Sequence, residues 1–262
     1  MNNETIRKIE KVLCDMMEKI LKKRIITEPF IEEDIEKANP FGYRLVPIEI
    51  WKGSKFERSF VTSLGQKAFE QLAKIIAEGT GAIAENQHVE EITINTWRKE
   101  KTDEILSLQR KSEKKPNWAA EVDEILALKN NKYEDLHVIF DLYIKRKNGK
   151  EEFYSIKTVK PNLDQTERAK RDMLYTKSCK EECEVYLALP FNPAGEGGNY
   201  REIHSIPYRL FEMDQDECVL IGSEFWNKVG EDENTYTQLL DVFERVGKKY
   251  SRKIKEDYLG LK

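Results

Sequence analysis

Cysteine and histidine are scarce in this chain of 262 residues, and their positions exclude several kinds of site. Of the four cysteines only Cys179 and Cys183 lie close together, and no histidine joins them at the spacing of zinc ligands. The three histidines, His88, His137 and His204, are scattered and form neither a catalytic triad nor an HExxH pattern. We therefore expect neither a zinc site nor a histidine-based nucleophile.

Long apolar runs are also lacking. No stretch approaches the roughly 20 apolar residues that a membrane span requires. The opening segment, MNNETIRKIEKVLCDMMEKILKKR, is too charged and too periodic for a signal peptide. These absences predict a cytoplasmic protein with no membrane partner.

An excess of basic charge is missing as well, because 44 Lys and Arg residues face 48 Asp and Glu residues, giving a net charge of −4. This balance excludes a protein that coats nucleic acid with its whole surface. It leaves room for a basic cleft in an acidic body, since such binding depends on the local placement of Lys and Arg.

The first half of the chain shows strong helical periodicity. Apolar residues at three- and four-residue spacing predict helices over 4–23 and 57–77. Residues 98–130 predict two helices separated by the basic loop RKSEKKPNW. Residues 39–54 hold aromatic residues and two prolines, and predict an irregular connection between helices.

The second half of the chain instead contains β-branched and aromatic runs that are typical of β-strands. Residues 91–97 and 184–191 each predict a strand, and LHVIFDLYIKRK and KEEFYSIKTVK predict a hairpin. A helix is expected after Asn162, which has capping-box spacing to Gln165, and the tail reads as mostly helical. The economical interpretation is one α/β domain over 1–262, with a central mixed β-sheet and flanking helices.

The hairpin carries a lone acid on one strand and a lysine on the other. Period-two alternation puts Ser155 and Lys157 on one face of their strand. A two-residue turn at Asn148-Gly149 would pair Asp141 with the opposite face. A three-residue loop with Gly149 left-handed pairs Asp141 with Ser155, so a shared site requires the longer loop or a bulge elsewhere in the hairpin.

An acid and a lysine at such a position suit phosphodiester hydrolysis. A divalent cation polarises the phosphoryl oxygen and helps to deprotonate the attacking water, and carboxylates hold that cation. A nearby lysine can position the water or neutralise charge on the phosphate. The alternative is a half-solvated hairpin with charged edges, and spacing alone does not choose between the two.

The wider string FDLYIKRKNGKEEFYSIKTVKPNLDQ resembles the active-site region of the TdeIII-type type II restriction endonucleases, in the PD-(D/E)XK nuclease superfamily. In that family the second strand reads close to FEIKTPKPN. The likeness extends to SFVTSLGQKAFEQLAKIIA, LPFNPAGEGGNY and EFWNKVGEDENTYTQLLDVFERVGKKY, which occur in the expected order across most of the chain.

The resemblance implies a restriction-endonuclease-like fold and Mg²⁺-dependent, sequence-specific cleavage of double-stranded DNA, with a GGNCC-type palindrome as target. It also implies a homodimer, because two-fold symmetry in the protein mirrors that of a palindrome. The helices over 4–23 and 235–256 could supply the dimer surface, or could equally be core.

The resemblance also assigns roles to particular residues. Asp141 matches the metal-binding aspartate and Lys157 the catalytic lysine. Ile156 holds the position whose backbone carbonyl often completes the metal shell. Glu70 matches a helix acid that many such nucleases direct at the site, although a solvated helix acid is the alternative.

Ser155 departs from the pattern, because it stands where the family has a catalytic glutamate, and a hydroxyl replaces a carboxylate poorly beside a divalent cation. Three explanations are open. The acid has moved to the following helix, with Glu167 the first candidate ligand and Asp164 the second. Alternatively, the chain is an engineered inactive variant, or it is a naturally degenerate nuclease. Two other functions stay open with them: a DNA-binding protein that does not cleave, and a structure-selective repair nuclease.

Candidate DNA contacts lie in two loops and one helix. The basic loop 109–118 offers a phosphate clamp, and the glycine-rich loop 189–200 follows a strand near the expected site. The alternatives are a solvated basic turn and an ordinary flexible loop. The candidates are Arg58, Lys111, Lys114, Lys115, Asn192, Asn199, Tyr200 and Arg201.

Overall fold

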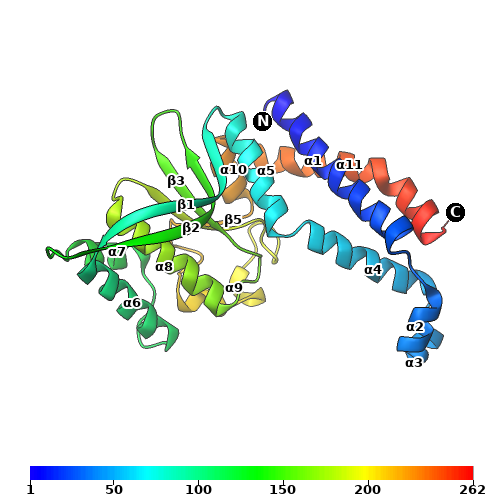
Figure 1. Cartoon of the computed structure of the whole chain (residues 1–262), viewed down its shortest axis with the longest axis horizontal. Coiled ribbons are helices and arrows are strands. Elements are labelled where there is room, and N and C mark those ends of the chain that lie inside the picture. The colour runs from blue at the N-terminus through cyan, green and yellow to red at the C-terminus, as the bar shows by residue number, and fades with distance from the viewer. Residues whose placement is uncertain (262) are drawn as a thin grey trace. The chain divides into compact units, whose positions relative to one another are not determined.

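The computed structural model describes residues 1–261, with only the backbone of Gln66 (Figure 1). The chain divides into two compact units. One comprises Met1 and Phe69–Tyr236, and we call it the sheet unit. The other comprises Asn2–Ala68 and the segment from Thr237 onward, and we call it the helical unit.

The sheet unit is built on five strands in the order β1-β2-β3-β4-β5. β1 and β2 pair antiparallel, as do β2 and β3, whereas β3–β4 and β4–β5 pair parallel, so the predicted mixed sheet is confirmed. The strand predicted over 91–97 is the end of a much longer strand, which stops at Asn95, and residues 96 and 97 begin a helix. β5 was not predicted because three residues give too little pattern. The strands are β1 (Ile83–Asn95), β2 (Tyr133–Lys145), β3 (Glu151–Ile156), β4 (Glu184–Leu189) and β5 (Val219–Ile221).

Helices cover this sheet. The crossover helix α8 follows β3 and buries Ala169 and Met173 in the core that holds Phe140 and Phe153. Its predicted capping box is confirmed, because Asn162 and Gln165 exchange both hydrogen bonds. The helical segments are α5 (Gln66–Gly79), α6 (Thr96–Arg110), α7 (Trp118–Leu126), α8 (Leu163–Cys179), α9 (Tyr200–Ile203), η2 (Ile206–Arg209) and α10 (Ser223–Gly230).

The helical unit joins the two ends of the chain. The apolar residues Leu13 and Met17 of α1 are buried, and the Tyr250 hydroxyl of α11 donates to Glu18 of α1 at 3.0 Å. In the part of the chain described here, no helix is long and apolar enough to cross a membrane. The segments are α1 (Asn3–Lys22), η1 (Lys23–Thr27), α2 (Glu32–Ala38), α3 (Pro40–Leu45), α4 (Ile48–Ser63), α11 (Thr235–Lys253) and η3 (Ile254–Leu259).

Two expectations for this region are wrong. The segment 39–54 is helical, because Pro40 stands in the first turn of α3 and Pro47 is the N-cap residue of α4, positions where proline starts a helix. The helix expected over 57–77 is two helices, since α4 ends at Ser63 and α5 begins at Gln66.

Candidate active site

The loop between β2 and β3 sets the register of the hairpin. The Arg146 N–H donates to the Lys150 carbonyl at 2.8 Å, and the Gly149 N–H donates to the Arg146 carbonyl at 2.9 Å. Gly149 has φ +87°, so the predicted three-residue loop with a left-handed glycine is confirmed. The ladder runs to Leu142 opposite Tyr154, and one further step in the same register puts Asp141 opposite Ser155.

Asp141 and Lys157 meet as that register requires. The Lys157 Nζ lies 2.8 Å from Asp141 Oδ2, and both side chains are largely buried. Lys157 follows the end of β3, and its N–H donates to the Ala188 carbonyl of β4 at 2.9 Å. The ammonium is therefore held beside the carboxylate from a backbone that is fixed by the neighbouring strand.

A second carboxylate approaches Asp141 through an amide. Glu70 on α5 is 3% exposed, so it is not the solvated helix acid of the alternative interpretation. The Gln87 Nε2 donates to Glu70 Oε2 at 2.9 Å and to Asp141 Oδ1 at 3.4 Å. Two acids thus converge on one hydrogen-bond donor, and sequence reasoning missed the residue between them.

Gln87 has an unusual backbone for a strand residue. Its φ is +52°, in the left-handed region, although it lies within β1 between Asn86 and His88, which pair with Leu142 and Phe140 of β2. A non-glycine residue in this region is strained by roughly 1–3 kcal/mol, and such residues cluster at functional sites. No sequence signal marks this residue, since glutamine has no special preference for this conformation.

The donor set at this point fits a hard divalent cation. Mg²⁺ is commonly bound through one or two carboxylates and keeps several waters. Asp141 and Glu70 supply two carboxylates that already share a positively polarised amide group. Within the described residues no three Asp, Glu, His or Cys side chains form a metal-binding group, so a further protein ligand would be a neutral oxygen, such as the backbone carbonyl of Ile156.

Glu167, the first candidate to replace a glutamate at 155, is bound by two arginines. Ser155 itself is buried, and it lies opposite Leu187 in the parallel ladder. Glu167 pairs with Arg110 at 2.5 Å and with Arg171 at 2.7 Å. Burial opposes ionisation of Glu167, yet these hydrogen bonds lower its pKa, so the carboxylate is already neutralised by arginine.

Asp172 on α8 is an acid whose pKa depends on the charges of the candidate site. Burial raises its pKa to about 6, Arg168 and Lys157 act to lower that pKa, and Asp141 acts to raise it. Asp172 lies beyond Glu167 on the same helix, about one and a half turns further along. No spacing pattern in the sequence marks it, because only the fold brings α8 near Lys157 and Asp141.

Comparison with known proteins agrees with this geometry. A sequence model of the type II restriction endonuclease family HinfI matches residues 5–247. This chain belongs to the HinfI family.

Individual relatives are also type II restriction enzymes. HgiEI of Herpetosiphon aurantiacus is 29% identical over 228 residues, which cover 84% of this chain and 81% of that enzyme. HgiCII of the same organism is 28% identical over 227 residues, with the same coverage. MjaII of Methanocaldococcus jannaschii is 26% identical over 210 residues, covering 74% of this chain and 55% of that enzyme. The expected class, a type II restriction endonuclease, is confirmed; the family model that matches is HinfI, and the narrower TdeIII type stays a prediction.

In this HinfI-family chain the basic loop between α6 and α7 is partly neutralised. Lys114 pairs with Glu124 at 2.6 Å, and Arg110 pairs with Asp164 at 2.7 Å. Lys111 and Lys115 are exposed, and among the described residues neither has a carboxylate partner. The loop therefore offers two available cations, fewer than its composition indicates.

The glycine-rich loop uses its candidate side chains within the protein. Tyr200 is buried, and its hydroxyl donates to the Val159 carbonyl at 2.9 Å, so its placement does not suit base contact. Asn192 donates to the Gly198 carbonyl, and Asn199 is the N-cap of α9. Arg201 is half exposed and stacks over Tyr208, its guanidinium carbon lying 4.0 Å from the ring centroid.

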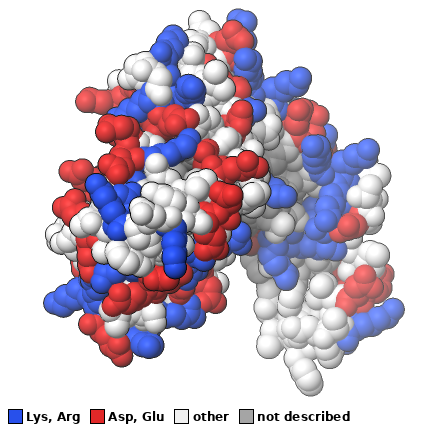
Figure 2. All heavy atoms as spheres, turned by 60° about the vertical axis from the view of Figure 1, so that its left-hand side comes forward, with Lys and Arg blue, Asp and Glu red and all other residues white. Residues whose placement is uncertain are grey.

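The protein surface is not covered by charge of one sign. On the face drawn in Figure 2, Lys and Arg alternate with Asp and Glu. This agrees with the net charge of −4. Arg58, the last of the candidate DNA contacts, is exposed on α4 of the helical unit. Several other basic side chains lie near it in that unit.

Proposed function

We propose that this HinfI-family protein is a Mg²⁺-dependent type II endonuclease that hydrolyses phosphodiester bonds of double-stranded DNA at a short palindrome. The proposal is carried by the contact between Lys157 Nζ and Asp141 Oδ2 at 2.8 Å, with Glu70 joined to the same carboxylate by Gln87. Family membership supports sequence-specific DNA cleavage as the activity class.

The roles follow from what each group can do. Asp141 and Glu70 would hold the cation, and the Ile156 carbonyl would be a third oxygen ligand. When bound, Mg²⁺ would polarise the phosphoryl oxygen and lower the pKa of the attacking water. Lys157 orients that water and stabilises charge that develops on the phosphate, because its ammonium is fixed by Asp141 and excluded from bulk solvent.

No carboxylate takes the place of the missing acid as a ligand in this proposal. Ser155 cannot hold a cation by charge, and Glu167 is committed to two arginines. Asp172 acts through Lys157, whose charge influences its pKa, and so it is a positioning residue and not a ligand. The proposed function then has two ligating carboxylates and one acid behind the lysine.

Cleavage of unmethylated plasmid with Mg²⁺ tests the proposal. Discrete fragments that vanish in EDTA are expected. Lys157→Ala should lower the cleavage rate by roughly 10²–10⁴-fold, the usual contribution of a positioned proton-transfer group. Lys132→Ala, an exposed lysine with no role here, is the matched control and should cut normally.

Ser155 favours one second candidate, a DNA-binding protein that does not cleave. That function predicts retarded but uncut plasmid with Mg²⁺. If Ser155→Glu then cuts at discrete sites, the missing carboxylate is the cause of inactivity. Degradation without discrete fragments would instead indicate a structure-selective repair nuclease.

We also propose a GGNCC-type target, which rests on the TdeIII-like sequence blocks. Sequencing the ends of plasmid fragments gives the target and the cut position together. Ends that share another motif would overturn this target without affecting the proposed chemistry.

A homodimer is proposed because a palindrome has two-fold symmetry. The apolar faces of α1 and α11 are already buried within the helical unit, as Leu13 and Val242 show, so the dimer would use other surfaces. Light scattering on the purified protein with and without duplex measures this; a monomer in both conditions would overturn it.

A further inference from the structure

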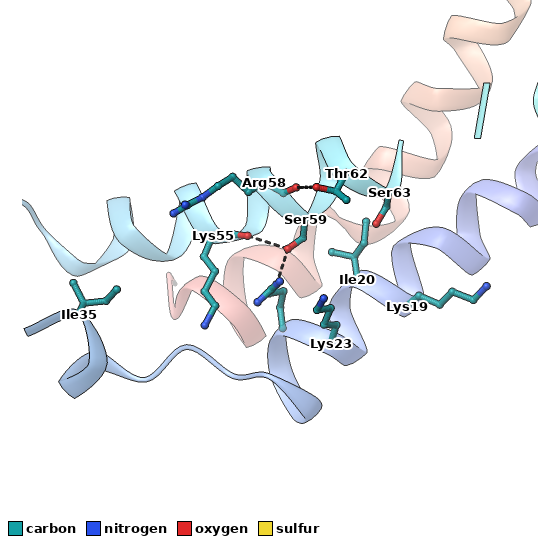
Figure 3. A pocket seen from close by; sticks show the side chains of 10 residues that line it. Lys19, Ile20, Lys23, Ile35, Lys55, Arg58, Ser59, Thr62 and Ser63 are labelled. Carbon is teal, nitrogen blue, oxygen red and sulfur yellow. Dashed lines mark hydrogen bonds between the residues drawn. The ribbon is translucent and has the colours of Figure 1, made fainter. Parts of the chain in front are cut away.

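A basic groove lies inside the helical unit, between α1 and α4. It has a volume of about 510 Å³ and lies wholly within this unit (Figure 3). Five cationic side chains line it: Lys19, Lys23, Arg24, Lys55 and Arg58. In Figure 3, Lys23 and Lys55 extend into the space between the helices, and Arg58 runs along α4.

The helices present these groups because of their spacing. Lys55, Arg58, Ser59, Thr62 and Ser63 of α4 follow one another at three- and four-residue intervals or as neighbours on one face. A hydrogen bond holds Arg24 against α4, because the Arg24 Nε donates to Ser59 Oγ at 2.6 Å. Hydroxyl groups therefore accompany the cations, as they do at phosphate sites.

The charges of the groove are only partly neutralised. Glu28 lies 3.5 Å from Lys23 and 3.6 Å from Arg24. Among the residues that the structure describes, Lys19, Lys55 and Arg58 have no carboxylate partner; Lys55 instead donates to the Pro29 carbonyl at 3.3 Å. Like charges gathered in a hollow repel one another, and among the described residues no carboxylate forms an ion pair with any of these three.

We infer that this groove binds the phosphate backbone of double-stranded DNA. The inference rests on the proposed function, since it names where the substrate is held by the helical unit. Eight residues of α4 separate Lys55 from Ser63, about 12 Å of helix. One strand of DNA carries a phosphate every 3.4 Å or so along the axis, so the groove spans roughly three phosphates. Three unneutralised cations match that number.

Salt dependence of binding tests the groove directly. A labelled 30-base-pair duplex of arbitrary sequence is titrated with the full chain in Ca²⁺, by fluorescence anisotropy at several salt concentrations. Lys19→Ala, Lys55→Ala and Arg58→Ala should each reduce the slope of log affinity against log salt by about 0.9. Lys11→Ala, an exposed lysine of α1 outside the groove, should leave the slope unchanged.

A gain-of-function variant separates the proposal from misfolding. Glu28→Gln releases Lys23 and Arg24 from their acid, so it should tighten binding and increase the salt slope by about one. A damaged protein would bind more weakly. Single-stranded DNA and heparin, titrated in parallel, show whether the groove prefers a duplex.

The outcomes are distinguishable from failure of the proposed function. If the parent protein cuts plasmid but the four groove variants (Lys19→Ala, Lys55→Ala, Arg58→Ala and Glu28→Gln) bind like the parent, the groove proposal is overturned and the nuclease stands. If the groove variants lose affinity and slope while the parent never cuts, the groove stands and the nuclease falls. Stronger binding to heparin than to duplex would overturn the choice of DNA as occupant.

Discussion

Gln87 combines a strained backbone with a bridging side chain. Its amide joins Glu70 and Asp141, and its φ of +52° is one that glycine adopts without strain. The strain directs the amide at the two acids. We interpret the residue as the group that keeps the carboxylates together when no cation lies between them.

Replacing Gln87 separates these two effects. Gln87→Ala should lower the free energy of unfolding by about 1–2 kcal/mol in EDTA, because two buried acids lose a shared donor. Gln87→Gly should be about 1 kcal/mol more stable than Gln87→Ala, because glycine relieves the backbone strain. Thermal unfolding in EDTA and in Ca²⁺ measures both, and Ca²⁺ should stabilise the variants more than the parent. Equal stability of the two variants would contradict the strain argument.

Asp172 gives a prediction on pH. Its pKa in the folded state is about 6, raised from 3.8 mainly by burial. The folded state therefore binds the proton more tightly than the unfolded state, and stability falls as pH rises from about 4 to 6. At 1.36 kcal/mol per pKa unit the loss is at most about 3 kcal/mol.

Asp172→Asn should remove that loss. The variant is expected to be about 1–3 kcal/mol more stable than the parent at pH 8 and of equal stability near pH 4. Urea unfolding at the two pH values measures the difference. A variant that is less stable at pH 8 would show that ionised Asp172 is stabilised by Lys157 more strongly than burial opposes it.

At the scale of elements, the Glu184 carboxylate links the start of β4 to the loop before β3 and to α10. Glu184 at the start of β4 accepts from Lys150 at 2.6 Å and from Lys228 of α10 at 2.8 Å. Burial opposes its ionisation, but the two lysines outweigh it and lower the pKa to about 2. The stabilisation is present above pH 4.5 and is lost as pH falls toward 2.

Glu184→Gln tests how much these two ion pairs contribute to stability. At pH 7 it should lower the free energy of unfolding by about 1–2 kcal/mol, a value reduced for the partial exposure of the three side chains. The difference from the parent should shrink toward zero near pH 2. Glu182→Gln, an exposed neighbour, is the control and should change stability by less than about 0.5 kcal/mol.

Elements whose cause is local could be predicted from the sequence, and elements set by distant packing could not. The capping box at Asn162 and the left-handed Gly149 depend on a few neighbouring residues, and both were predicted. The break between α4 and α5 was not, because the apolar spacing continues across Leu64.

The same division applies to the candidate site. Asp141 and Lys157 could be paired from the alternation of one hairpin and one loop length. Gln87 and Asp172 could not, because β1 and α8 bring them close from distant parts of the chain. Ion pairs of Glu167 with Arg110 and Arg171 are likewise invisible in a search by spacing.

On the scale of the whole molecule, the helical unit depends on both ends of the chain. Arg245 of α11 pairs with Glu10 of α1 at 3.0 Å, and Tyr250 contacts α1 as well. Buried apolar residues on both helices supply most of the stability, because exposed ion pairs contribute little.

Deleting residues 237–262 should therefore unfold the helical unit and spare the sheet. Hydrogen exchange should show loss of amide protection in α1 and α4 and retention in β2 and β3. Binding to the 30-base-pair duplex should weaken in parallel. Retained protection in α1 would show that the amino-terminal helices fold without α11.

The discontinuous helical unit has a consequence during synthesis. Residues 69–236 leave the ribosome before α11 does, and at about 5–20 residues per second that interval lasts roughly 10–30 seconds. During this time α1 has no partner for its apolar face, and the basic groove, whose lining residues lie within 19–63, lacks the support of α11. The helical unit therefore becomes stable only after α11 has emerged, so a chain that is still being translated would lack a firmly held α1 and with it a firmly held basic groove.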